Sequence, residues 1–228
     1  MKTLIIARHG NTFRAGESPT RVGAHTDLEL VEEARGRAVG KYLLAKGLMP
    51  DRILAAPLKR TMGTAQLAAE ELGCSCPITP DARFIEVDYG PDENKTEDVV
   101  ELQLGQRICA ATGKCACGMS NEDIQQLGKE EIERWNTEAI VPNGWQVDVE
   151  QICKNWQELA DSIAEGETLL CVSSNGTIRF APSITGDYAA FCAEHDIKVA
   201  TGGVCIFTSE DGTTWTCSEW GTKAIKKV

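Results

Sequence analysis

The stretch "KTLIIARHGNT", residues 2–12, is a short apolar run that ends in Arg8, His9 and Gly10. Its aliphatic and β-branched side chains predict a buried strand over residues 2–8. In open α/β sheets, ligands bind outside the carboxyl ends of the strands. We therefore expect Arg8 and His9 to lie at the edge of a sheet where a ligand binds.

Strands and helices alternate along the chain, which predicts an α/β fold. Apolar runs predict further strands at 51–56 and 167–173, and two antiparallel strands within 198–220 around an Asp-Gly turn at 211–212. Periodic apolar residues predict helices at 31–47, 57–73 and 183–195. We expect a single domain, residues 1–228, with a mainly helical insertion at about 96–165.

The net charge of −11 argues against general binding to nucleic acid or to an anionic membrane, because both require a positive surface field. The apolar run 3–7 is too short for a signal peptide, and no apolar stretch reaches the roughly 20 residues of a membrane helix. We therefore expect a cytoplasmic protein. An edge in the C-terminal strand pair leaves a homodimer possible as a second expectation.

The chain has ten cysteines, and without a signal peptide reduced thiols are expected. An alternative is a thiolate metal site, for which the candidates are Cys74, Cys76, Cys109, Cys115 and Cys117. Their spacings match no paired C-x-x-C pattern. We therefore expect surface or packed thiols, and neither a metal nor a cofactor.

Two other predicted strand ends carry polar residues. The strand at 51–56 leads into Lys59 and Arg60, and the strand at 167–173 leads into Ser174 and Asn175. With Arg8 and His9, these ends and the acidic loop 81–95 are expected to converge on one cleft.

Four ordered segments resemble the histidine phosphatase superfamily, which includes phosphoglycerate mutases and many phosphatases. "ARHGNT" (7–12) resembles its first motif, and "APLKRTMGTA" (56–65) is similar to its S-P-L-x-R-x-x-x-T-A segment. "DLELVEEARGRA" (27–38) and "FIEVDYG" (84–90) resemble a helix-entry segment and an acidic loop. The resemblance implies a three-layer phosphoglycerate mutase-like fold, with a central, mostly parallel sheet flanked by helices.

The resemblance implies His9 as the nucleophile that forms a phosphohistidine, with Arg8 and Arg60 holding the phosphoryl group. These residue types suit the reaction, since a neutral imidazole can attack phosphorus and guanidinium groups bind its oxygens. Glu86 is implied as the proton donor and later the base. An alternative for Glu86 is a solvated acidic turn, in which Asp88, Asp92 and Glu93 are equal candidates.

The chain departs from the family where a second histidine normally follows the strand 167–173. Here Ser174 stands at that position and Asn175 follows it, and both can donate a hydrogen bond but carry no charge. Arg14 and Arg21 are candidates to supply the lost charge, against an alternative as solvated arginines. Asn11 and Thr12 can donate to phosphate from the loop after His9.

The two remaining histidines are His25 and His195. We expect His195 to be a surface residue, and His25 is a minor candidate for the cleft. The tryptophans at 135 and 145 are expected to pack a helical core rather than to line the cleft.

The sequence predicts a phosphomonoesterase that acts on a small phosphorylated metabolite through a phosphohistidine, slowed by the loss of the second histidine. One alternative is a weak or inactive member of the family that binds a phosphorylated ligand. A further alternative is phosphoryl transfer of the phosphoglycerate mutase type. The motif S-x-W-N, which follows R-H-G in glycolytic mutases, is absent from this chain. Its absence argues against the mutase alternative.

Overall fold

The computed structural model describes residues 1–113 and 118–225. The chain divides into two compact units. The first comprises Met1–Arg14, Asp27–Glu86 and Asp148–Val228, and the second comprises Ala15–Thr26 and Val87–Val147. Each unit is described on its own below.

The first unit contains a six-stranded sheet with the order β3-β2-β4-β1-β5-β6. The strands are β1 (Lys2–Arg8), β2 (Arg52–Ala55), β3 (Ile78–Pro80), β4 (Thr168–Ser173), β5 (Gly203–Ser209) and β6 (Thr216–Lys223). The first four strands in this order pair in parallel, whereas β5 and β6 join as antiparallel strands. This confirms the predicted α/β fold with a mostly parallel central sheet.

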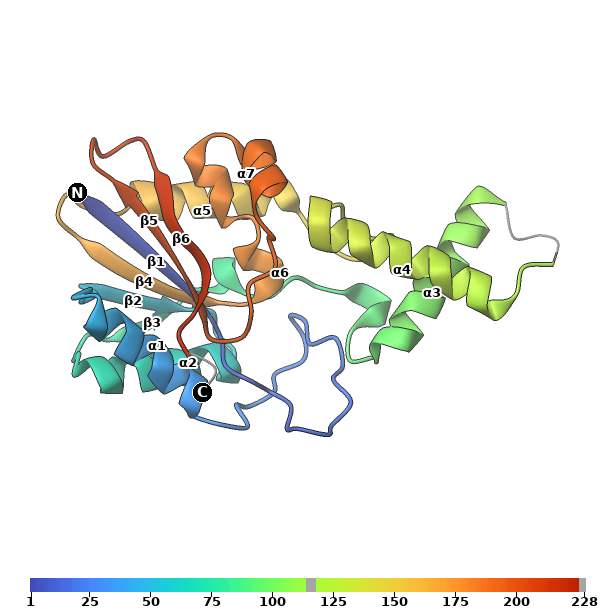
Figure 1. The fold of residues 1–228 in the computed structure, drawn as a ribbon, viewed down its shortest axis with the longest axis horizontal. Helices are drawn as coiled ribbons and strands as arrows, with labels where there is room; N and C mark the ends of the chain where they lie inside the picture. Colours follow the sequence, from blue (N-terminus) through green and yellow to red (C-terminus); the bar gives the residue numbers. More distant parts are fainter. Residues whose placement is uncertain (114–117, 226–228) are drawn as a thin grey trace. The chain divides into compact units, whose positions relative to one another are not determined.

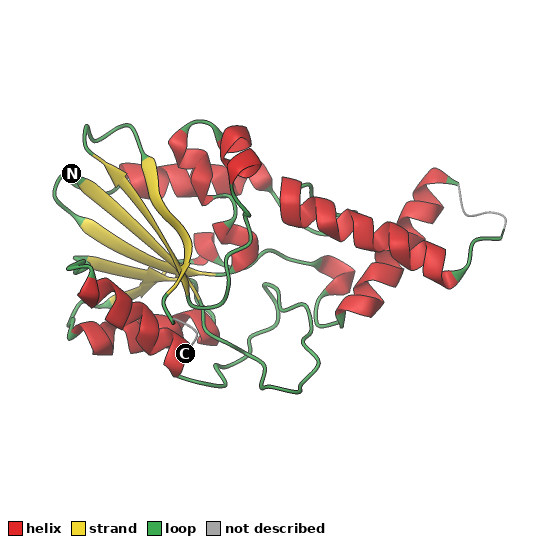
Figure 2. Ribbon diagram, viewed as in Figure 1, coloured by secondary structure: helices red, strands yellow, loops and turns green. Residues whose placement is uncertain are grey.

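Helices cover both faces of this sheet (Figures 1 and 2). On one face lie α1 (Ala34–Ala45) and α2 (Lys59–Leu72), and on the other lie α5 (Val149–Asp161) and α7 (Tyr188–Glu194). Three short turns of helix, α6 (Asn175–Ile178), Ala82–Phe84 and Ala181–Thr185, complete the unit. The resulting three layers are those that the sequence predicts.

The central strands of the sheet carry buried apolar side chains. Leu4, Ile5 and Ile6 of β1 are fully buried, as are Leu169 and Leu170 of β4. Because both faces of a parallel sheet are covered, continuous rather than alternating apolar runs are expected in its central strands. The buried cysteines at 171 and 205 lie in this core and behave as small apolar side chains, as predicted.

The register of the sheet brings two predicted strand ends together. Arg8 at the end of β1 lies beside Ser173 at the end of β4. The backbone N–H of His9 then donates to the carbonyl of Ser173 at 3.1 Å. The parallel pairing of β1 and β4 therefore places His9 next to Ser174.

The second unit is built on α3 (Glu97–Thr112), α4 (Asn121–Glu138) and the turn Gly90–Asp92. Its core is aromatic, because the rings of Trp135 and Trp145 lie 5.4 Å apart and Tyr89 contacts Trp145 at 4.7 Å. Trp135 and Trp145 are buried, which confirms the prediction that they pack a helical core.

Several local expectations need adjustment. The strand β3 and the helix α6 were not predicted, because three or four residues are too few to show a periodic pattern. The helical segment predicted at 96–165 divides between the units, since α5 lies in the first. Cys109 is disulfide-bonded, contrary to the expectation of a reduced thiol, and Cys115 and Cys117 lie outside the described residues.

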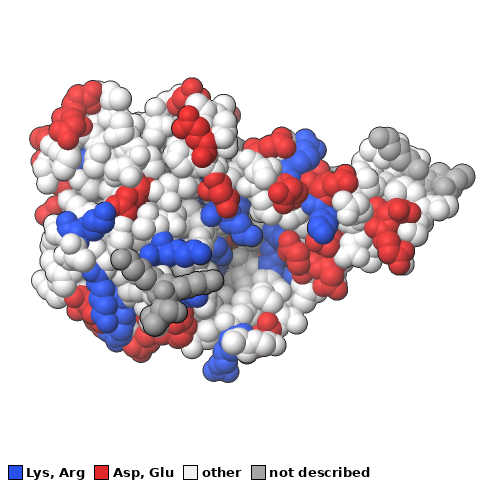
Figure 3. Space-filling model, in the orientation of Figure 1, with Lys and Arg blue, Asp and Glu red and all other residues white. Residues whose placement is uncertain are grey.

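The surface carries charged side chains of both signs, which are interspersed over the face drawn in Figure 3. Within the described residues, every helix is too short or too polar to cross a lipid bilayer.

The contact between α3 and α4 depends on two glycines that let the backbones approach. A Cβ atom added at Gly128 would lie 1.8 Å from the carbonyl oxygen of Glu101, and one at Gly105 would lie 1.8 Å from that of Ile124. Both distances are far inside van der Waals contact. The two helices therefore cannot keep this separation if either position carries a side chain.

We predict that Gly128→Ala lowers the free energy of unfolding by at least about 1 kcal/mol, because the added methyl group forces the helices apart. Without this contact the same substitution in a helix would stabilise by about 0.5–1 kcal/mol. Urea denaturation measures the change, with the exposed neighbour Lys129→Ala as the control. An unchanged or higher stability in Gly128→Ala would contradict the close packing.

Candidate active site

The imidazole of His9 lies just beyond the end of β1 and is only 6% exposed. Its Nδ1 atom lies 2.7 Å from the carbonyl oxygen of Gly10. A carbonyl oxygen only accepts hydrogen bonds, so Nδ1 carries the proton and donates it. The lone pair of the neutral ring is therefore on Nε2.

The surroundings of His9 keep its ring uncharged. Burial, and then the positive charges of Arg8 and Arg60, hold the pKa of His9 well below its usual value of 6.5. The hydrogen bond to Gly10 opposes this shift but does not reverse it. At neutral pH the ring is thus uncharged, with its single proton on Nδ1 and an available lone pair on Nε2.

The hydroxyl of Thr64 joins the loop after β1 to the first turns of α2. It donates to the carbonyl of Arg60 at 2.7 Å and accepts from the backbone N–H of Gly10 at 3.0 Å. Arg60 itself is completely buried near the start of α2. One hydroxyl therefore couples the position of the Gly10 carbonyl, which orients His9, to the helix that carries Arg60.

A loop before β5 holds Arg8. The guanidinium of Arg8 donates to the carbonyl of Val199 at 2.6 Å, and the N–H of Gly202 donates to the carbonyls of Arg8 and His9 at 3.1 Å each. The side-chain oxygen of Asn175 accepts from the N–H of Val199 at 2.8 Å. Asn175 therefore holds the loop that positions Arg8.

Glu86 belongs to the same unit as His9 and is 4% exposed. Two hydroxyls, one at the end of β4 and one in α6, hold the segment before it. Ser173 donates to the carbonyl of Phe84 at 2.6 Å, and Thr177 donates to the carbonyl of Ile85. The residues that follow β4 thus position the candidate acid, a role that the sequence did not indicate.

Ser174 is fully buried, and its hydroxyl has no hydrogen-bond partner within the described part of the chain. Such a group is uncommon, because a buried polar atom without a partner costs about 1–3 kcal/mol. Asn175 is engaged at its oxygen, whereas the Ser174 hydroxyl retains its capacity to donate. Ser174 is therefore the stronger of the two candidates for a ligand contact.

The other predicted phosphate-binding residues differ in their surroundings. The side-chain oxygen of Asn11 accepts from the Thr201 hydroxyl at 2.7 Å, Thr12 is half-buried and Arg14 is exposed.

Arg21 lies in the second unit, where it pairs with Glu97 at 2.5 Å and stacks over the rings of two aromatic residues, Tyr89 and Trp145. It is thus not the solvated side chain of the alternative interpretation.

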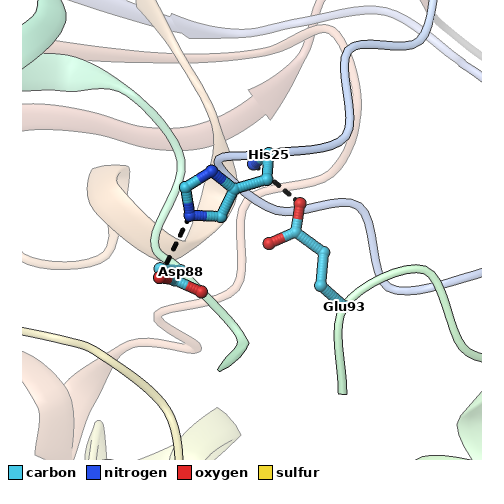
Figure 4. A group of neighbouring side chains, drawn as sticks. All are labelled: His25, Asp88 and Glu93. Carbon is cyan, nitrogen blue, oxygen red and sulfur yellow. Dashed lines mark hydrogen bonds and ion pairs between the residues drawn. The ribbon is translucent and has the colours of Figure 1, made fainter. Parts of the chain in front are cut away.

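The three acids that competed with Glu86 all lie in the second unit. Asp92 is fully buried, forms an ion pair with Arg107 and accepts from the indole N–H of Trp145 at 2.8 Å, so it has a structural role. Asp88 pairs with His25, and Glu93 accepts from the backbone N–H of His25 (Figure 4). Only Glu86 among the four shares a unit with His9.

The two other histidines are both exposed. His25 lies in the second unit, is 74% exposed and pairs with Asp88. His195 follows α7, is exposed as predicted, and stacks on the ring of Phe191 at 4.2 Å.

Residues 4–110 match the family model described as "Histidine phosphatase superfamily (branch 1)". This range is just under half of the 228 residues, and it contains His9, Arg60 and Glu86 but not Ser174.

Curated relatives match over a similar part of the chain. A 2,3-bisphosphoglycerate-dependent phosphoglycerate mutase of Thermobifida fusca (strain YX) is 30% identical over 106 residues, which are 46% of this chain and 43% of the relative. The enzyme of the same name from Methylobacterium sp. (strain 4-46) is 33% identical over 113 residues, 46% of this chain and 51% of the relative. The matches thus span about half the length of these proteins.

Solved structures resemble the whole chain. A mycobacterial glucosyl-3-phosphoglycerate phosphatase in complex with VO3 has a TM-score of 0.67 and 18% identity, covering 97% of this chain and 100% of that one. Bacillus stearothermophilus YhfR has a TM-score of 0.66 and 20% identity, covering 96% of each chain. At such identities the likeness concerns the fold. The chain therefore has the fold of the histidine phosphatases, and residues 4–110 match the sequence model of that superfamily.

Proposed function

We propose that this chain is a histidine phosphatase that hydrolyses a small phosphorylated metabolite through a phosphohistidine at His9. The observation that carries the proposal is the state of the His9 ring. It is buried and neutral, its Nδ1 proton is donated to Gly10, and the positive charges of Arg8 and Arg60 act on the ring and lower its pKa.

In the first step Nε2 of His9 attacks phosphorus, and the bond from phosphorus to the ester oxygen breaks. The negative charge on the transferring group is spread over its outer oxygens, which Arg8 and Arg60 stabilise. Glu86 gives its proton to the departing alkoxide. The products of this step are the alcohol, a phosphohistidine and an ionised Glu86.

In the second step water attacks the phosphohistidine. Glu86 takes a proton from the water, the bond between Nε2 and phosphorus breaks, and inorganic phosphate leaves. His9 returns to its neutral form and Glu86 to its protonated form. The hydrogen bond to Gly10 persists throughout, so the ring keeps the same orientation in both steps.

Two observations support second candidates. The curated relatives named above are phosphoglycerate mutases, which favours transfer of the phosphoryl group to a second alcohol instead of to water. The uncharged Ser174 favours a protein that binds a phosphorylated ligand with little turnover. The trapping experiment below separates the binder from both enzymes, and the products separate hydrolysis from transfer.

We predict that His9→Gln lowers kcat for an aryl phosphate by at least about 10³-fold, because the change removes the ring that accepts the phosphoryl group. Rapid acid-free quenching with a labelled phosphodonor should trap one base-stable, acid-labile adduct on His9 in the wild-type protein. His195→Gln, which changes an exposed histidine, serves as the control and should retain both signals. Equal turnover in wild type and His9→Gln, without an adduct, would support the binder instead.

We predict that Ser174→Ala lowers kcat/KM by about tenfold. This factor corresponds to the loss of one hydrogen bond to the phosphoryl group, which contributes about 1.4 kcal/mol. The same change should leave the unliganded protein as stable as the wild type or more stable, because it removes a buried hydroxyl without a partner. Steady-state kinetics and thermal unfolding test the two effects. Loss of stability with unchanged kcat/KM would show that Ser174 has a structural role only.

The low pKa of His9 predicts how stability depends on pH. The unfolded chain binds a proton at His9 near pH 6.5, whereas the folded chain does so only at lower pH. Protonation therefore favours unfolding below pH 6.5, and the contribution of the neutral ring is fully present only above that value. The free energy of unfolding should therefore fall by up to about 1.4 kcal/mol per pH unit as the pH decreases from 6.5 toward the pKa of His9 in the folded chain.

Urea denaturation of wild type and His9→Gln at pH 7.5, 6.0 and 5.0 measures this contribution as a difference, which removes the titration of other groups. We predict that the wild type loses more stability than His9→Gln on acidification. Parallel losses in the two proteins would contradict a lowered pKa for His9.

A further inference from the structure

The second unit holds two segments in a fixed register, the loop 20–26 and the segment 87–96. The backbone N–H of Ala24 donates to the carbonyl of Val87 at 3.2 Å. Nearer the start of the loop, the backbone N–H of Arg21 donates to the carbonyl of Lys95 at 2.9 Å. The backbone N–H of Asn94 donates to the carbonyl of Arg21 at 2.8 Å. Side chains that face one another across these segments are therefore held in place by the backbone.

Three such side chains, His25, Asp88 and Glu93, point toward one another (Figure 4). Each offers one nitrogen or oxygen atom that can ligate a metal, and these atoms all lie within 4.8 Å of one another. None of the three takes part in the proposed phosphoryl transfer.

The other oxygen of each carboxylate is already engaged. Asp88 Oδ1 accepts from the backbone N–H of Gly90 at 2.7 Å. Glu93 Oε1 accepts from the N–H of His25 at 2.7 Å and from the hydroxyl of Thr26 at 2.8 Å. Partners of this kind orient metal ligands in proteins, where they fix one oxygen and direct the other at the ion. Asp88 Oδ2, which pairs with His25, and Glu93 Oε2, which has no hydrogen-bond partner within the described residues, are the oxygens that remain for a metal ion.

Glu93 Oε2 is shielded from solvent, and it has no hydrogen-bond partner in the part of the chain that the structure describes. Figure 4 shows this oxygen directed toward the His25 ring and Asp88. Within the same described residues, Glu93 forms no ion pair, and Asp88 pairs with His25 only. Two carboxylates at this separation repel each other unless a cation lies between them.

We propose that His25, Asp88 and Glu93 bind a divalent transition-metal cation, with Nε2 of His25 and one oxygen from each carboxylate as ligands. Imidazole together with carboxylate oxygen suits ions from Mn²⁺ to Zn²⁺. Adjacent ligands of a six-coordinate ion with bonds of about 2.1 Å lie about 3 Å apart. The separation of 3.1 Å between His25 Nε2 and Asp88 Oδ2 matches this spacing.

Opposite ligands of such an ion lie about 4.2 Å apart, so the widest of the three separations closes by less than about 1 Å on binding. The remaining coordination positions are filled by water, because the His25 side chain is 74% exposed and that of Asp88 is 30% exposed.

Titration of the full-length protein with Mn²⁺, followed by the loss of the electron paramagnetic resonance signal of the free ion, tests the site. Mn²⁺ avoids binding to the free thiols, which prefer softer ions. We expect one ion bound per chain in the wild type. His25→Ala and Asp88→Asn should each weaken binding by about tenfold or more, because each removes one ligand.

The control is His195→Ala, which removes an exposed histidine outside this cluster and should bind as the wild type does. Circular dichroism verifies the fold of each variant, and His25→Gln supplies a conservative replacement if His25→Ala does not fold. Absence of Mn²⁺ binding by the wild type up to millimolar concentration would overturn the proposal. Equal affinity in wild type, His25→Ala and Asp88→Asn would overturn it as well.

Discussion

A hydrogen bond from Nδ1 of His9 to the carbonyl of Gly10 determines which ring nitrogen carries the lone pair. Burial and two neighbouring guanidinium groups keep that ring neutral. The Thr64 hydroxyl ties Gly10 to the first turn of α2, because it accepts from the Gly10 N–H and donates to the carbonyl of Arg60. The sheet supplies the rest, because the pairing of β1 with β4 places His9 beside Ser173.

The sequence predicts the parts of this arrangement that depend on local pattern. Apolar runs locate β1 and β4, and the residues after them identify His9 and Ser174. The contacts of Thr64, Ser173 and Thr177 were not predictable, because each joins carbonyls or N–H groups whose proximity exists only after folding. A motif containing a hydroxyl residue, such as R-T-M-G-T in α2, is the only hint that the sequence offers for Thr64.

The difference between local pattern and tertiary contact also explains why the helical insertion predicted at 96–165 divides between the two units. The helical pattern at 96–165 is continuous in sequence, but α3 and α4 pack on each other whereas α5 packs in the first unit. Amphipathic periodicity identifies a helix without identifying its partner. The glycines at 105 and 128, spaced within two neighbouring helices, allow the close contact that assigns α3 and α4 to one unit.

The state of the His9 ring is open to direct observation by nitrogen NMR of protein with labelled histidine, since the chain has only three histidines and substitution of each assigns the signals. We expect the His9 ring at pH 6.5 to be neutral, with the proton on Nδ1 and the lone pair on Nε2. A proton on Nε2, or a ring that is charged at pH 6.5, would contradict the account of His9 as the nucleophile.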